Sequence, residues 1–195
     1  MRHLKIPISP SKIRYLSDLH LEMFSMSTSF RTHMNKLVPE HADDADSVLI
    51  AAGDISSSIE GLEAFLEEMT PRFQAIILIA GNHEYYGHVR QEHDATMKVV
   101  MKRFFECDAV YVGLENAIIE FDNFVTVAGT LWADGGKTPV ETLMMNKYLR
   151  CLKVIQESFD IPEAPFVKTM KYTAQMMRSD NLATRRDFKE ALERY

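Results

Sequence analysis

Residues of the kinds that bind metal ions follow three apolar stretches of this sequence. Asp18 and His20 come after the first stretch, Asp54 after the second and Asn82 after the third. Asp18 and His20 are two residues apart, so in extended backbone their side chains point the same way and could hold one cation. The Asp54 carboxylate has two oxygens and could bridge two cations, and Asn82 offers a neutral amide oxygen. The sequence therefore predicts a shared cluster of oxygen and nitrogen ligands.

This ligand set indicates a particular kind of metal chemistry. Mixed oxygen and nitrogen ligands suit Mn²⁺, Fe or Zn²⁺, whereas a structural Zn²⁺ site prefers thiolates. Two such ions about 3.5–4 Å apart would clamp a phosphate and generate a hydroxide nucleophile at neutral pH. Each residue also has a structural alternative, because an Asp after a strand is commonly a turn former or a helix cap, and His83 alone would be a hydrogen-bonded structural histidine. The order of the three groups favours the metal site.

The apolar stretches are predicted to be strands whose carboxyl ends carry the site. The stretch 76–80 is rich in isoleucine and is typical of a strand buried on both faces. Gly81 then lets the backbone turn before Asn82. Ligands of open α/β sheets bind at the carboxyl ends of the strands. We expect strands, in chain order, at 12–17, 47–52 and 75–80.

Helices are predicted between and after these strands. Ser57 and Glu60 form a capping box before an amphipathic helix that Pro71 ends, and a second helix is expected at about 89–105. A short helix is expected near residues 30–37, within a loop or lid. Helical spacing in the last third of the chain predicts further helices from about 138, at 166–178 and from about 182 to the end.

The middle of the chain has a different pattern. A short strand at 110–112 precedes two apolar runs, 117–121 and 124–129, which flank Asp122-Asn123 and predict a hairpin. Strand–helix alternation followed by a hairpin indicates an α/β fold with a mixed sheet. No convincing domain boundary is visible, so a single domain over 1–195 is expected.

Composition excludes some classes of function. The net charge of −6 gives no strong signal for nucleic-acid binding. No apolar run approaches the roughly 20 residues of a membrane span, and no secretory signal is visible near the N-terminus. Cys107 and Cys151 are the only cysteines, so a disulfide framework is not expected and a reducing cytoplasm is the predicted location.

The polar groups at the strand ends resemble a known family. They match the first three signature blocks of the calcineurin-like metallophosphoesterases, namely Asp18-x-His20, Gly53-Asp54 and Gly81-Asn82-His83-Glu84. Gly129-Thr130-Leu131-Trp132 is similar to a further block of some bacterial and phage members. The resemblance covers roughly residues 12–134. It implies a four-layer α/β/β/α sandwich and a metal-dependent phosphoesterase that hydrolyses phosphomonoesters or phosphodiesters.

The resemblance also implies a role for each matched residue. Asp18 and His20 would bind the first of two divalent metal ions (Mn, Fe or Zn), Asp54 would bridge them, and Asn82 would bind the second. In the reaction, His83 would face the phosphate, together with Asn82, and protonate the leaving oxygen. Glu84 would support the ligands from behind them.

The chain departs from the family pattern in its histidines. The pattern continues with later histidine blocks that supply three further metal ligands, but no histidine follows His93, so 195 − 93 = 102 residues contain none. The fold is therefore predicted to be C-terminally incomplete, matching about the first two-thirds of the pattern. By that pattern the first metal keeps Asp18, His20 and Asp54. The second keeps only Asp54 and Asn82 and is expected to bind weakly.

Three explanations of this departure stay open. The chain is a truncated product, a natural short form whose site another subunit completes, or a degenerate homologue without turnover. The predicted function is a metal-dependent phosphoesterase acting on a phosphorylated small molecule or nucleotide. The alternative is a non-catalytic form of the fold that binds metal, phosphate or protein. Among the other candidates, we expect His88 at the surface, His93 half-buried and Tyr85 packed around the turn, and Asp134 is either a site residue or an ordinary turn residue.

Overall fold

The computed structural model describes residues 1–24, 29–85, 88, 90–130, 182–183, 185–191 and 193. The chain divides into two compact units, Met1–Thr130 and Leu131–Tyr195. In the second unit, residues 182–183 and 185–191 are helical, which agrees with the helix predicted from about 182. The helices expected between 138 and 178 lie outside the described residues. No helix in the described part of the chain is long and apolar enough to cross a membrane.

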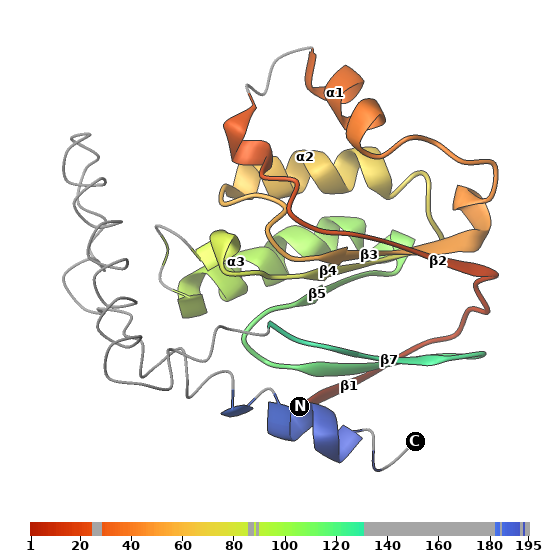
Figure 1. The fold of residues 1–195 in the computed structure, drawn as a ribbon, viewed down its shortest axis with the longest axis vertical. Coiled ribbons are helices and arrows are strands. Elements are labelled where there is room, and N and C mark those ends of the chain that lie inside the picture. The colour runs from red at the N-terminus through yellow and green to blue at the C-terminus, as the bar shows by residue number, and fades with distance from the viewer. Residues whose placement is uncertain are drawn as a thin grey trace, which may run out of the picture. The chain divides into compact units, whose positions relative to one another are not determined.

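The first unit contains a parallel sheet of four strands (Figure 1). Its strand order is β2-β3-β4-β5 and every neighbouring pair is parallel. The strands are β2 (Lys12–Leu16), β3 (Ser47–Ala52), β4 (Ala75–Ile79) and β5 (Ala109–Val112). All four strands were predicted, and their parallel arrangement brings their carboxyl ends to one edge of the sheet.

A second sheet of three strands is built around the predicted hairpin. Its members, in spatial order, are β1 (Arg2–Ile6), β6 (Ala117–Phe121) and β7 (Val125–Ala128). β6 and β7 pair antiparallel, and the Phe121 N–H donates to the Phe124 carbonyl at 2.8 Å, so the two-residue turn at Asp122-Asn123 is confirmed. β1 pairs parallel with β6. The predicted mixed sheet is therefore this second sheet, because the hairpin pairs with β1 and not with the strands of the parallel sheet.

β1 is the strand that sequence reasoning missed. The prediction placed the first strand at 12–17, although Leu4 and Ile6 alternate with the polar residues His3 and Lys5. This period of two is the pattern of a half-buried strand. Ile6 belongs to the core between the two sheets, with Leu4 packed against it.

The core of the first unit has two layers of side chains, one on each face of the parallel sheet. Ile77 of β4 belongs to the cluster between the sheets and Ile79 packs against it, whereas Ile76 and Leu78 alternate with them and are fully buried outside it. Helices α2 (Ile59–Met69) and α3 (Arg90–Met101) cover that other face (Figure 1). The burial of β4 on both faces is therefore confirmed.

The helices differ from prediction mainly at their ends. The Ser58 hydroxyl accepts the Gly61 N–H at 3.1 Å, so Ser58 and not Ser57 caps α2, because the helix begins at Ile59. The helix expected at 89–105 ends as α3 at Met101 and continues as a 3₁₀ helix. α1 spans Ser29–Leu37, as predicted, and packs on α2. The described part of the first unit thus has α, β and β layers. The second helical layer of the α/β/β/α sandwich is not among its described elements.

A buried ion-pair cluster ties together the segments at the amino ends of the strands. Asp44, which precedes β3, is 5% exposed and accepts hydrogen bonds from Arg72 at 2.8 Å and from Arg14. Arg72 also donates to the carbonyls of Val38 and Pro39. Burial opposes ionisation of Asp44, but the two arginines outweigh it and hold its pKa below the ordinary value. The end of the sheet opposite the predicted site is thus fixed by charge pairing.

Candidate metal centre

The three groups predicted to hold the first metal meet beyond the carboxyl ends of β2 and β3. The Asp18 N–H donates to the Gly53 carbonyl and the His20 N–H donates to the Asp54 carbonyl, each at 3.1 Å. These bonds continue the pairing of the two strands into the loops. Ligand atoms of Asp18, His20 and Asp54 consequently lie within 4.8 Å of one another. Asp18 is exposed and the other two are half-buried, so the cluster opens to solvent on one side.

The backbone is strained at the same three residues. Asp18, His20 and Asp54 have φ angles of 58°, 47° and 55°, in the left-handed region that residues other than glycine rarely adopt. Among the described non-glycine residues only Asp108 shares this feature. Such conformations cost about 1–3 kcal/mol each and cluster at active sites and ligand clamps. The coincidence of strain and ligand chemistry makes this cluster the candidate functional site.

Two glycines allow the loops to approach so closely. Gly53 has a φ of 87°, and a Cβ atom on it would lie 2.8 Å from the Gly81 Cα. A Cβ on Gly81 would lie 2.3 Å from the Asp54 Oδ1 and 2.6 Å from the Asp54 nitrogen. Gly81 has no positive φ, so the reason for this glycine differs from the predicted one. It leaves room for Asp54, whereas Gly53 makes the unusual turn.

The buried Glu84 side chain connects the loop after β3 to the loop after β4. Its carboxylate is fully buried and accepts four backbone N–H groups, at distances between 2.6 and 3.2 Å, from Asp54, Ile55, Ser56 and Gly81. Burial raises the pKa of Glu84, although the N–H groups act in the opposite direction. The residue expected to support the ligands thus does so through the backbone of Asp54.

His83 and Asn82 lie in the turn after β4. The His83 N–H donates to the Asp54 Oδ1 at 2.9 Å, and the His83 ring lies edge-on to the His20 ring with 4.4 Å between centroids. The Asn82 carbonyl accepts the Tyr85 N–H at 3.2 Å, and Asn82 is half-buried. The Gly129–Trp132 motif also contacts this turn, because the Thr130 hydroxyl donates to the Ala80 carbonyl. Leu131, Trp132 and Asp134 lie outside the described residues.

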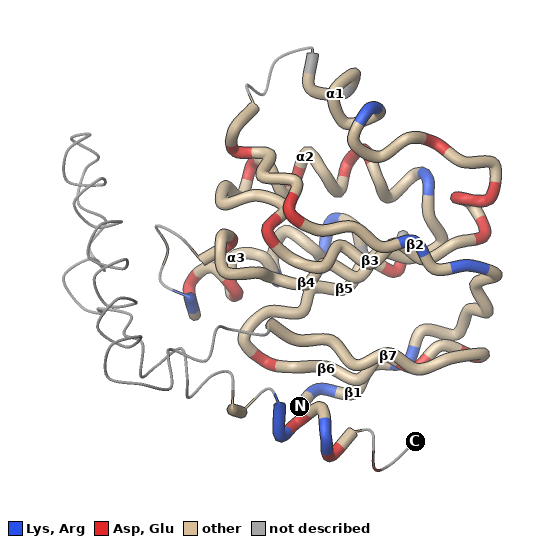
Figure 2. The backbone as a smooth tube through the Cα atoms, in the orientation of Figure 1, with Lys and Arg blue, Asp and Glu red and all other residues tan. Residues whose placement is uncertain are grey.

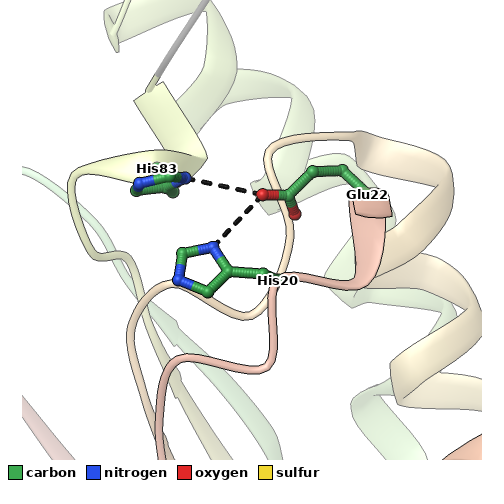
Figure 3. Close-up of side chains that lie close together, drawn as sticks. All are labelled: His20, Glu22 and His83. Atoms are coloured by element: carbon green, nitrogen blue, oxygen red, sulfur yellow. Dashed lines mark hydrogen bonds and ion pairs between the residues drawn. The ribbon is translucent and has the colours of Figure 1, made fainter. Parts of the chain in front are cut away.

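Glu22 is a site residue that sequence reasoning missed. Its Oε1 lies 3.3 Å from the His20 Nδ1 and 3.5 Å from the His83 Nδ1 (Figure 3). Its Oε2 accepts the Ser57 N–H at 3.1 Å. Burial opposes ionisation of Glu22, but backbone N–H groups and the His20 ring outweigh it and lower its pKa. The available signal was an acidic residue only two positions after His20.

The remaining candidates have structural contacts. His88 is half-buried and its Nε2 donates to the Ser57 carbonyl at 2.9 Å. His93 is 2% exposed, so the expectation of a half-buried residue is wrong; α3 presses it against Tyr85 and His88. Burial and the neighbouring His88 lower the pKa of His93 to about 4. Tyr85 is buried and donates to Asp94 at 2.8 Å, which agrees with a packing role.

The fold and the cluster together define a class of protein. Asp18, Glu22, Asp54 and Glu84 all follow strands of the parallel sheet, and Figure 2 shows acidic positions in the loops at this edge. Carboxylates and imidazoles grouped at the carboxyl ends of parallel strands are typical of a metal-dependent hydrolase. The chain belongs to the calcineurin-like phosphoesterase family, whose pattern matches residues 11–175. Family membership confirms the resemblance that the motifs indicated.

Two relatives illustrate the range of this similarity. Over 129 residues the chain is 26% identical to the uncharacterized protein L509 of Acanthamoeba polyphaga mimivirus, covering 63% of this chain and 44% of the viral protein. The crystal structure of phosphopantetheinyl hydrolase (PptH) from Mycobacterium tuberculosis matches 91% of this chain and 62% of that enzyme, with a TM-score of 0.52 and 19% identity. The second likeness confirms the α/β fold. The chain spans less than two-thirds of the length of either relative.

Proposed function

We propose that this chain is a metal-dependent phosphoesterase that hydrolyses phosphomonoesters or phosphodiesters of small molecules or nucleotides. The observation that carries the proposal is the approach of Asp18, His20 and Asp54 to within 4.8 Å of one another, on strained backbone at the edge of the parallel sheet. We expect the protein to act in a reducing cytoplasm.

The donor set fits a divalent cation. Two carboxylates and one imidazole suit Mn²⁺, Fe or Zn²⁺, and three protein ligands with open positions are characteristic of a catalytic site and not of a structural one. A second cation would find Asp54 and Asn82 among the predicted ligands, and we expect it to bind more weakly. A bound cation would act as a Lewis acid toward water and neutralise charge on the phosphate.

The protein side chains have separate tasks in this proposal. His83 adjoins His20 and would give a proton to the leaving oxygen, which is general acid catalysis worth about 10²–10⁴-fold in rate. Asn82 precedes it in the same turn and would contact the phosphate. Glu84 fixes the backbone of Asp54 and Gly81, so the ligand loop and the proton donor stay in register.

The test is hydrolysis of an aryl phosphate monoester and a bis-aryl phosphate diester, each with Mn²⁺ and with EDTA. The variants are Asp54→Asn and His83→Ala, with Glu67→Gln as the control, because Glu67 is an exposed acidic residue of α2. We expect Mn²⁺-dependent turnover in wild type and control, and a loss of about 100-fold or more in both site variants. Equal residual rates in all four proteins would overturn the catalytic proposal.

A second candidate function follows from the absence of histidine after His93. In this version the fold binds metal, phosphate or a protein partner without turnover, or another copy of the chain completes the site. Its test is calorimetric titration of inorganic phosphate in the presence of Mn²⁺, combined with measurement of mass in solution. Phosphate binding without hydrolysis of either ester supports this candidate. Two tightly bound metal ions in an active monomer would contradict it.

A further inference from the structure

We propose that Glu22 is a positioning residue shared by His20 and His83, which turns the Nδ1 of both rings toward one carboxylate oxygen and leaves Nε2 for the metal ion and the phosphate. The inference rests on the proposed function, because it assigns the tasks of the two rings to cation binding and proton donation. It adds a residue that lies outside the matched motif positions.

The contacts of Glu22 determine which nitrogen of each ring carries the proton. One oxygen, Oε1, faces His20 Nδ1 at 3.3 Å and His83 Nδ1 at 3.5 Å, and Figure 3 shows the two rings reaching it from different loops. An ionised carboxylate only accepts hydrogen bonds, so each Nδ1 must be the donor. In a neutral imidazole the other nitrogen, Nε2, then carries the lone pair.

The carboxylate of Glu22 is itself held in place. Its second oxygen accepts the Ser57 N–H at 3.1 Å, and the Ser57 carbonyl accepts the His88 Nε2 at 2.9 Å. The Glu22 side chain is only 20% exposed. Anchoring from the loop before α2 means that Glu22 is not a solvated surface acid that meets the two histidines by chance.

Glu22 therefore affects both metal binding by His20 and proton donation by His83. Through His20 it fixes the orientation and raises the basicity of a metal ligand, an effect worth about 10–100-fold in metal affinity. Through His83 it keeps a proton on Nδ1, so that the doubly protonated ring gives its Nε2 proton to the leaving oxygen, the N–H electron pair stays on Nε2, and the ring returns to its neutral Nδ1–H form. A merely structural residue would change neither the tautomer of the two rings nor the coupling between their effects.

The decisive experiment records long-range ¹H–¹⁵N correlations of the histidine rings in metal-free protein at about pH 8. In wild type and in Glu67→Gln we expect His20 and His83 to be protonated at Nδ1. In Glu22→Ala we expect both rings to lose that preference. Nε2–H rings in wild type, or unchanged tautomers in Glu22→Ala, would overturn the inference, and the wild-type result alone suffices if the variant does not fold.

Two further readouts separate this inference from the proposed function. Glu22→Gln should weaken Mn²⁺ binding by about 10–100-fold in calorimetry. It should also lower kcat less in a His83→Ala background than in wild type, because one of its two routes is already lost. Expected tautomers without any hydrolysis would reject the proposed function and keep the role of Glu22 in ring orientation. Hydrolysis combined with histidine tautomers that do not change in the Glu22 variants would keep the proposed function and reject the role of Glu22.

Discussion

Replacing Glu84 by Gln should loosen the two loops that form the metal centre. In the native protein each carboxylate oxygen of Glu84 accepts two hydrogen bonds: Oε1 from the Ile55 and Ser56 N–H groups, and Oε2 from those of Asp54 and Gly81. Glutamine keeps one acceptor oxygen but turns an NH₂ group toward two buried N–H donors. Two backbone donors therefore lose their partners, at about 1–3 kcal/mol each.

One effect opposes this loss. Burial raises the pKa of Glu84, so the ionised carboxylate is costly to bury, and the neutral amide removes that cost. We therefore expect the lower half of the range, a net destabilisation of about 3 kcal/mol. Because about 1.4 kcal/mol corresponds to a tenfold change, amide protection in the Asp54 and Gly81 loops should fall by about 100-fold.

The assay combines urea unfolding with hydrogen exchange of the four amides. Glu67→Gln on the exposed side of α2 makes the same chemical change and should leave both measurements near wild type. The decisive comparison is between the Asp54 and Gly81 amides and those in the middle of β3, which belong to the core. If Glu84→Gln kept the wild-type urea midpoint and the wild-type protection of the four amides, the loop-tying role of Glu84 would be refuted.

Three further predictions follow from other contacts. Gly81→Ala places a Cβ 2.3 Å from the Asp54 Oδ1, so it should cost about 1–3 kcal/mol in urea unfolding and weaken Mn²⁺ binding in calorimetry, and an unchanged affinity would argue against the close approach. The pKa of His93 is lowered to about 4, so its contribution to the free energy of unfolding is complete above the ordinary value of 6.5 and is lost as pH falls toward 4. At about pH 5 the wild type should have lost about 2 kcal/mol of unfolding free energy through this group, and His93→Leu should show none of that loss. Asp44→Ala strands Arg72 in a buried setting, so unfolding should be easier by about 3–5 kcal/mol, and a change under 1 kcal/mol would contradict the account of that cluster.

The sequence was informative where local order alone brings residues together. Asp18, His20 and Asp54 follow neighbouring parallel strands, so their meeting required only that the apolar runs pair side by side. The hairpin around Asp122-Asn123 was readable for the same reason, since its strands adjoin in the chain. The strand at Arg2–Ile6 was overlooked because its partner lies more than 100 residues away and its alternation is short.

Contacts between side chains from separate loops could not be predicted from the sequence. Glu22 lies two positions after a predicted ligand, but its meeting with His83 depends on how the loops after β2 and β4 fold over each other. Glu84 was correctly expected to support the ligands, yet nothing in the motif shows that it does so through four backbone amides. Gly81 was predicted to be a turn residue, whereas a glycine is needed there because Asp54 occupies the space of a Cβ atom, and only the fold determines that position.

The most direct test of the metal centre is anomalous diffraction from crystals grown with Mn²⁺. The account predicts a strong peak in contact with the side chains of Asp18, His20 and Asp54, and a weaker one, or none, beside Asn82. The same crystals of Asp54→Asn should lose the strong peak or show it much reduced. A Mn²⁺ peak elsewhere, or no peak in wild-type crystals at millimolar Mn²⁺, would contradict the proposal that these three residues form the cation site of a phosphoesterase.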